Sequence, residues 1–108
     1  MPSTGTPGTG MPIEELQAKD LPQDCFVFKH STACPISRMA ADEVKSTDFE
    51  LPLYWINVIQ QRDLSNWVAT TYAVRHESPQ LLLIKNGKVQ QVWNHHEIKR
   101  SDISRKAT

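Results

Sequence analysis

The feature that most limits the fold is a pair of apolar segments separated by a stretch with helical spacing. Residues 24–29 are apolar from Cys25 to Phe28, and residues 53–59 form a second run rich in aromatic and β-branched side chains. Such runs predict strands, the first covered on both faces. Residues 35–46 carry inward apolar side chains at helical spacing. This order predicts a right-handed strand–helix–strand unit with two parallel strands.

The second half of the chain predicts a helix and then a hairpin. Apolar residues repeat at helical spacing behind Asp63, which is a plausible helix cap, so we expect a helix to about Tyr72. Pro79 leads into residues 80–85, and Asn86-Gly87 separates them from residues 88–93. Asn-Gly between two such runs is typical of a type I′ turn. From Glu97 onward we expect a short polar helix. Together these elements predict an α/β fold with a four-stranded mixed sheet flanked by helices.

The first 12 residues contain three prolines and three glycines and have little to bury, which predicts a disordered tail. Residues 13–18 follow Pro12, carry acidic residues early, and place Ile13 and Leu16 on one face. This pattern favours a short helix. We therefore expect one folded domain over residues 13–108.

Charge and hydropathy exclude several classes of function. Twelve basic and twelve acidic side chains cancel. This argues against nucleic-acid partners, because proteins that bind nucleic acids generally carry an excess of basic side chains. The sequence has no run of about 18 apolar residues and no pattern of a secretory signal. We therefore expect a cytoplasmic protein without a membrane partner. Two cysteines in a reducing compartment favour catalytic or buried thiols over a structural disulfide.

Cys34 lies where the first predicted strand gives way to the first predicted helix. At a helix start the unpaired N–H groups and the helix dipole favour a thiolate, which is the reactive form of cysteine. Pro35 suits the first helical position. Ser37 stands where a dithiol enzyme would carry its second cysteine, and a hydroxyl can donate to a thiolate but cannot form a disulfide. The pattern predicts a monothiol nucleophile; the alternative is an inert thiol packed under the helix.

The order of elements, together with Cys-Pro-x-Ser at the first helix start, resembles the thioredoxin fold. In that superfamily the proline that opens the third strand is cis and faces the active cysteine. The preceding backbone is then free to pair with a bound disulfide. The resemblance assigns these roles to Pro79 and Ser78 of the segment Glu77-Ser78-Pro79-Gln80.

More narrowly, residues from about 24 to 96 resemble the monothiol bacilliredoxins. Ala33 stands where threonine is expected, a departure that should leave the chemistry unchanged, whereas variation at Asn94-His95-His96 puts ligand contacts there in doubt. The resemblance is carried by Phe28-Lys29-His30-Ser31, Cys34-Pro35-Ile36-Ser37, Arg62, Ser65-Asn66 and His76-Glu77-Ser78-Pro79-Gln80.

This resemblance implies that Cys34 takes bacillithiol from a protein mixed disulfide and is reset by a second thiol. Bacillithiol would be a co-substrate, and no cofactor is implied. A lone nucleophile without a resolving thiol must pass its adduct to an outside partner. Because bacillithiol carries a malate, we expect positive groups and N–H donors around the site, although each could also be an ordinary surface residue. The candidates, besides Ser37, Pro35, Ser78 and Pro79, are Lys29, His30, Arg38, Arg62, His76, His95 and His96.

Other functions remain open on the sequence. Ser31-x-x-Cys34 suggests a thiol peroxidase, although Val27 stands where such enzymes carry proline. An iron–sulfur carrier would resemble Cys-Gly-Phe-Ser, and a non-catalytic adaptor requires an unreactive Cys34. Zinc is disfavoured because no Cys-x-x-Cys or His-x-x-x-His spacing occurs.

A disulfide between Cys25 and Cys34 is not expected. The strand from Cys25 to His30 alone spans about 16 Å, whereas the Cα atoms of a disulfide lie within roughly 7 Å. We therefore expect Cys25 to be a core thiol, with a redox role as the alternative.

Overall fold

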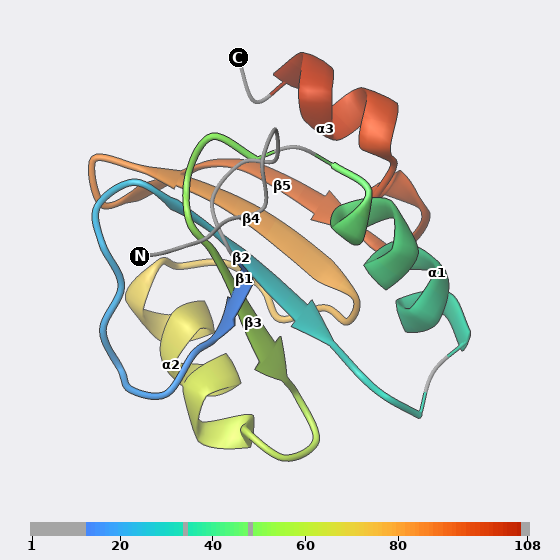
Figure 1. The fold of residues 1–108 in the computed structure, drawn as a ribbon. Helices are drawn as coiled ribbons and strands as arrows, with labels where there is room; N and C mark the ends of the chain where they lie inside the picture. Colours follow the sequence, from blue (N-terminus) through green and yellow to red (C-terminus); the bar gives the residue numbers. More distant parts are fainter. Residues whose placement is uncertain (1–12, 34, 48, 107–108) are drawn as a thin grey trace, which may run out of the picture.

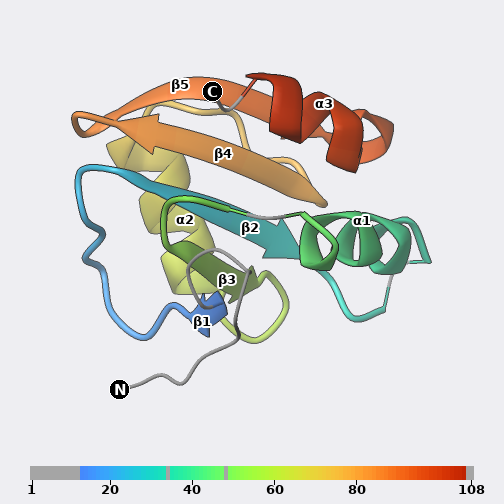
Figure 2. The ribbon, with the colours of Figure 1, turned by 45° about the horizontal axis from the view of Figure 1, so that its top comes forward.

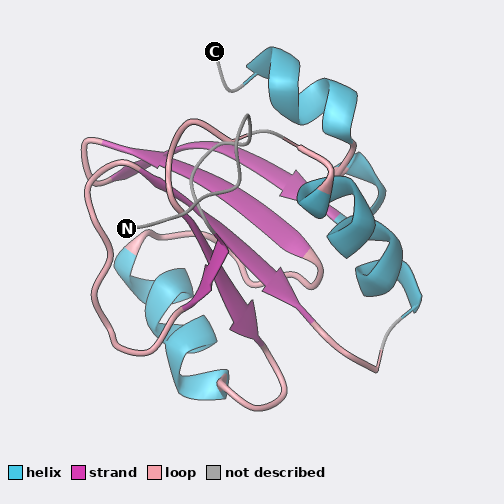
Figure 3. Cartoon of the chain, viewed as in Figure 1, coloured by secondary structure: helices cyan, strands magenta, loops and turns pink. Residues whose placement is uncertain are grey.

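The computed structural model describes residues 13–33, 35–47 and 49–106. The predicted tail of residues 1–12 and the predicted nucleophile Cys34 lie outside the described residues. The helices and strands follow the expected alternation, with one added strand near the start of the chain (Figures 1 and 3). They are β1 (Ile13–Glu15), β2 (Cys25–His30), α1 (Pro35–Lys45), β3 (Leu53–Asn57), α2 (Arg62–Thr71), β4 (Gln80–Lys85), β5 (Lys88–Asn94), a 3₁₀ helix (His95–Glu97) and α3 (Arg100–Lys106).

The described strands form one mixed sheet in the order β1-β3-β2-β4-β5. β2 pairs with β3 in parallel, as expected for the strand–helix–strand unit. β4 runs antiparallel to both β2 and β5. Asn86 and Gly87 both have positive φ, 55° and 75°, as a type I′ turn requires. The predicted α/β architecture and the hairpin are therefore confirmed.

The helix predicted over residues 13–18 is wrong. Residues 13–15 form β1, which pairs in parallel with β3 from Leu53 to Trp55. The Leu16 backbone N–H continues this pairing by donating to the Trp55 carbonyl at 2.8 Å. The sheet consequently has a fifth strand beyond the four predicted. The edge of β3 supplies hydrogen-bond partners that no local sequence pattern reveals.

Several predicted boundaries also move. The last helix was expected from Glu97 onward, but Glu97 ends a 3₁₀ helix and α3 begins at Arg100. α2 begins at Arg62 with Gln61 as its N-cap, so Asp63 lies inside the first turn and is not the cap. β3 ends at Asn57, before the predicted end at Ile59. The Asn57 side-chain oxygen accepts the backbone N–H groups of Ile59 and Gln60, at 3.0 and 3.2 Å, and this bends the chain into a turn.

The sheet separates two apolar cores, because side chains alternate between its faces. Phe26 and Phe28 point toward α1 and α3, and they pack with Val44 and Ile103. Cys25 and Val27 point to the other face, which α2 covers. Figures 1 and 2 show α2 on the opposite side of the sheet from α1 and α3. No described helix has the length and apolar character needed to cross a membrane.

Candidate active site

The loop between β2 and α1 is tied to the first turn of the helix. The Ser31 backbone N–H donates to the Ser37 hydroxyl oxygen at 3.1 Å, and the Ala33 N–H donates to the Ser31 hydroxyl oxygen at 3.3 Å. Ser37 is 1% exposed. Pro35 is the first residue of α1, as predicted. Residues on both sides of Cys34 in the chain are therefore held by hydrogen bonds, while Cys34 itself lies outside the described residues.

The Ser78–Pro79 peptide bond is cis, as predicted. Pro79 is buried and leads directly into β4, whose first residue Gln80 pairs with Lys29 of β2. The proline thus lies at the carboxyl end of β2, where the chain leaves toward residue 34. The hydroxyl oxygen of Ser78 is buried and has no hydrogen-bond partner within the described ranges.

β5 returns the two neighbouring histidines to this end of the sheet, as the topology predicts. The His95 backbone N–H donates to the Pro79 carbonyl at 2.9 Å. Its imidazole Nε2 lies 3.2 Å from a carboxylate oxygen of Glu77. His95 and His96 also line a small hollow with Ile36 at the start of α1. The structure therefore brings together the helix start, the cis-proline segment and the histidine pair.

His30 and Arg38 lie in a different hollow, on the α1 side of the sheet. This space of about 340 Å³ adjoins the β2–α1 loop and is also lined by Lys45 and Trp55. The His30 ring stacks on Phe28 and meets the Trp55 ring edge to face. Burial, together with the charge of Lys45, lowers the pKa of His30, so the neutral imidazole is favoured.

Lys29 lies on the opposite face of the sheet and is fully buried, with 0% of its surface exposed. Its ammonium nitrogen is 3.3 Å from Nδ1 of His76, and the same Nδ1 is 3.2 Å from the Ser65 hydroxyl. Burial lowers the pKa of Lys29 to about 8. Of the predicted ligand-binding residues, Lys29 is thus shielded from solvent, whereas His76 is exposed.

Gln80 is a site residue whose role the sequence did not predict. Its buried side-chain amide donates to the Arg75 carbonyl and to the Asn94 side-chain oxygen, both at 2.9 Å. These bonds tie the segment before Pro79 to β5. A glutamine at the head of an otherwise apolar strand was the available signal for this role.

Cys25 is a fully buried core thiol, as predicted. Burial, with the nearby charge of Asp24, raises its pKa to about 12, so it carries almost no thiolate at neutral pH. Its sulfur donates a weak bond to the Pro22 carbonyl at 3.6 Å. Among the described residues, no cluster of three or more His, Cys, Asp or Glu side chains could hold a metal ion.

Cys25→Ser should leave thiol-transfer turnover within about twofold of the wild type and lower the free energy of unfolding by roughly 1–2 kcal/mol. The reason is that a hydroxyl would replace an apolar thiol in the core. Urea unfolding and turnover with purified components measure the two effects. A halt in turnover would instead make Cys25 a resolving thiol.

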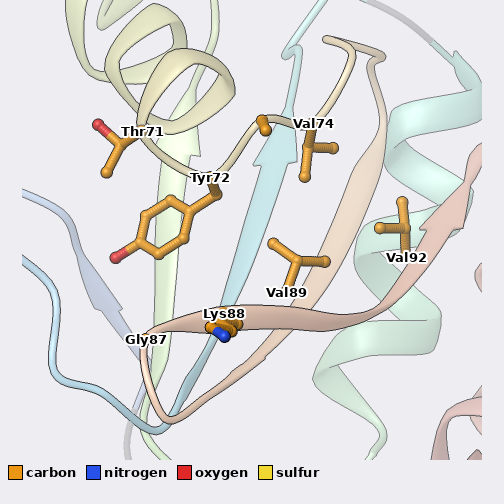
Figure 4. A pocket seen from close by; sticks show the side chains of 8 residues that line it. Thr71, Tyr72, Val74, Gly87, Lys88, Val89 and Val92 are labelled. Carbon is orange, nitrogen blue, oxygen red and sulfur yellow. The ribbon is translucent and has the colours of Figure 1, made fainter.

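A further hollow, of about 550 Å³, lies between the end of α2 and the β4–β5 hairpin (Figure 4). Tyr72, Val74 and Val89 line it. The Gly87 N–H bonds to the Gln23 carbonyl, which places the hairpin turn beside the start of β2. This hollow is therefore at the opposite end of the sheet from Pro79.

Comparisons with known proteins agree with this arrangement. The family model described as monothiol bacilliredoxin BrxC matches residues 9–103. A solved structure described as an oxidoreductase with a thioredoxin fold is 30% identical, with a TM-score of 0.78, and the match covers 89% of this chain and 94% of that one. Fasciola hepatica thioredoxin is 18% identical, with a TM-score of 0.59 and coverage of 78% and 77%. Trxlp from Edwardsiella tarda is 14% identical, with a TM-score of 0.69 and coverage of 90% and 99%. The last two matches show the fold alone.

Proposed function

The chain belongs to the monothiol bacilliredoxin family of thioredoxin-fold thiol oxidoreductases, and from this we propose that it removes bacillithiol from protein mixed disulfides through Cys34. The observation that carries the proposal is the position of Cys34 in the sequence. In the chain it falls between a hydrogen-bonded loop and Pro35, the first residue of α1. That loop leaves β2, the strand that pairs with Gln80 directly after the cis Pro79. A thiolate is favoured at such a helix start.

The proposed reaction has two thiol exchanges. The Cys34 thiolate attacks the bacillithiol sulfur of the mixed disulfide, a new disulfide forms between them, and the substrate protein leaves as a thiolate that takes a proton from water. A second low-molecular-weight thiol, as its thiolate, then attacks the bacillithiol sulfur of this disulfide, which forms a low-molecular-weight disulfide and releases Cys34 as a thiolate. Ser37 cannot supply an internal resolving sulfur, so the outside thiol is required. No cofactor takes part, and we assign the reaction to a reducing cytoplasm.

Within this proposal the described residues position the reactants. The Ser37 hydroxyl holds the Ser31 N–H and keeps the loop against α1. The backbone around Ser78 and Pro79 forms the platform along which the disulfide would lie. His95 and His96 border the helix start, and His30 and Arg38 line the hollow beside the loop.

Intact-mass spectrometry tests this function directly. The reduced protein is incubated with a bacillithiolated protein that has a single cysteine, and peptide mapping follows. We expect one bacillithiol adduct, on Cys34. Formation of a sulfinic acid on Cys34 with peroxide, but no adduct, would support a peroxidase instead. No modification under either condition would make the chain a non-catalytic adaptor.

A further inference from the structure

Lys29, Ser65 and His76 form a polar cluster under the cis-proline segment, on the α2 face of the sheet. Lys29 comes from β2, Ser65 from α2, and His76 from the connection that leads to Pro79. His76 Nδ1 lies 3.3 Å from the Lys29 ammonium and 3.2 Å from the Ser65 hydroxyl. Three separate elements thus converge on one ring nitrogen, and the cluster is not a product of neighbouring residues in sequence.

The contacts determine where His76 carries its proton. An ammonium group can only donate hydrogen bonds, so Nδ1 must accept from charged Lys29. The proton of the neutral imidazole then lies on Nε2. Burial and then the charge of Lys29 lower the pKa of His76 and keep it neutral, while Glu77 acts in the opposite sense and Arg62 adds a smaller lowering. The exposed His76 therefore presents an Nε2–H donor, which the buried Lys29 ammonium on the other side of the ring polarises.

The cluster lacks an anion. Among the described residues, neither Lys29 nor Arg62 has a carboxylate within 4.0 Å. Glu77 is the nearby acid, and its oxygens face Arg75 at 3.5 Å and His95 at 3.2 Å. A buried charge normally requires a partner, so a cation left without one favours a bound anion.

The position of the cluster matches one end of the proposed thiol site. Lys29 pairs with Gln80, the residue after Pro79, and His76 lies three residues before that proline. If a small thiol exchanges its sulfur near Pro79, an anionic group on the same molecule would lie close enough to contact His76. Bacillithiol carries such an arm in its malate.

We infer that His76, backed by buried Lys29 and flanked by Arg62, binds a carboxylate of the low-molecular-weight thiol. This inference rests on the proposed function for the identity of the thiol. His76 is the contacting residue in this assignment, and Lys29 is a positioning residue that acts through it. Ser65 holds the imidazole in place from the α2 side.

The kinetic test compares two leaving groups on one reporter protein. The reporter is prepared as a mixed disulfide with bacillithiol and, separately, with 2-mercaptoethanol, which has no carboxylate. Lys29→Met removes the charge, and His76→Asn keeps an acceptor for Lys29 but removes the outer N–H. For both variants we expect the rate constant with the bacillithiol disulfide to fall roughly tenfold to hundredfold, as for loss of a charge-assisted hydrogen bond. The rate with the mercaptoethanol disulfide should stay within about twofold.

Lys88→Met is the matched control, because it removes the same charge from an exposed residue at the far end of the sheet. It should leave the ratio of the two rates unchanged. If Lys29→Met and His76→Asn slow both disulfides equally, the cluster only supports the cis-proline segment and the inference is overturned.

A binding measurement separates this inference from the proposed function, because it needs no chemistry. S-methyl bacillithiol, which cannot exchange, is titrated into the wild type and both variants by calorimetry. Binding to the wild type that weakens roughly tenfold or more in the variants supports the carboxylate site, even if transfer fails. Equal affinity in all three proteins, or no binding to the wild type, overturns it.

Discussion

Replacing Cys34 with serine is expected to reduce bacillithiol transfer to the rate of uncatalysed exchange. Serine is almost entirely protonated at neutral pH and cannot form the mixed disulfide on which the first exchange depends. The other cysteine cannot substitute, because Cys25 is fully buried and burial raises its pKa to about 12. The loss should therefore be complete rather than partial.

The measurement is release of the free reporter thiol over time, with Cys34→Ser, Cys25→Ser and wild-type protein at equal concentration. Circular dichroism should show the same fold for all three, since each substitution exchanges one sulfur atom for oxygen. Turnover that persists in Cys34→Ser at a protein-dependent rate would remove Cys34 as the nucleophile.

Local sequence patterns predicted most of the fold correctly, because most of its elements have local causes. The apolar run at Cys25 to Phe28 needed cover on both faces, and α1 and α2 supply it. Asn86-Gly87 specified the hairpin through its positive φ angles. The parallel arrangement of β2 and β3 followed from the helix between them.

β1 was missed for a physical reason that the sequence does not carry. Residues 13–15 have acidic side chains after a proline, which favours a helix start. Their strand conformation comes from pairing with β3, 40 positions further along the chain at Leu53. Tertiary hydrogen bonds therefore overrode a weak local preference.

In the site, too, the features with local causes were predicted and one that depends on tertiary contacts was not. Pro35 at the helix start and the return of His95 to that edge were predicted from a short motif and from topology, and the cis Pro79 was predicted from the resemblance to the thioredoxin fold. Burial of Lys29 was not predicted. Its shielding depends on α2 and on His76, 47 positions away, so a lysine at the end of a strand looked like a surface residue.

Lys29→Met should stabilise the protein, and the gain should depend on pH. Burial lowers the pKa of Lys29 from 10.5 to about 8 in the folded state. Below pH 8 both states are protonated, so the folded wild type carries the full cost of a buried ammonium. Between pH 8 and 10.5 the folded state releases this proton before the unfolded state does, so wild-type stability rises with pH. The advantage of methionine is therefore largest below pH 8 and shrinks toward pH 10.5.

A pKa difference of this size corresponds to at most roughly 3–4 kcal/mol, to which the apolar burial of methionine adds a constant amount. Urea unfolding under reducing conditions at several pH values from 7 to 10.5, with Lys88→Met as control, measures the change. Titration of Tyr54, Tyr72 and Cys25 occurs in both proteins and cancels in the difference. His76 loses the influence of Lys29 in the variant, but it titrates below this range. A difference that stays flat with pH would mean that Lys29 keeps an ordinary pKa in the folded protein, and its ammonium could not then be a desolvated charge behind His76.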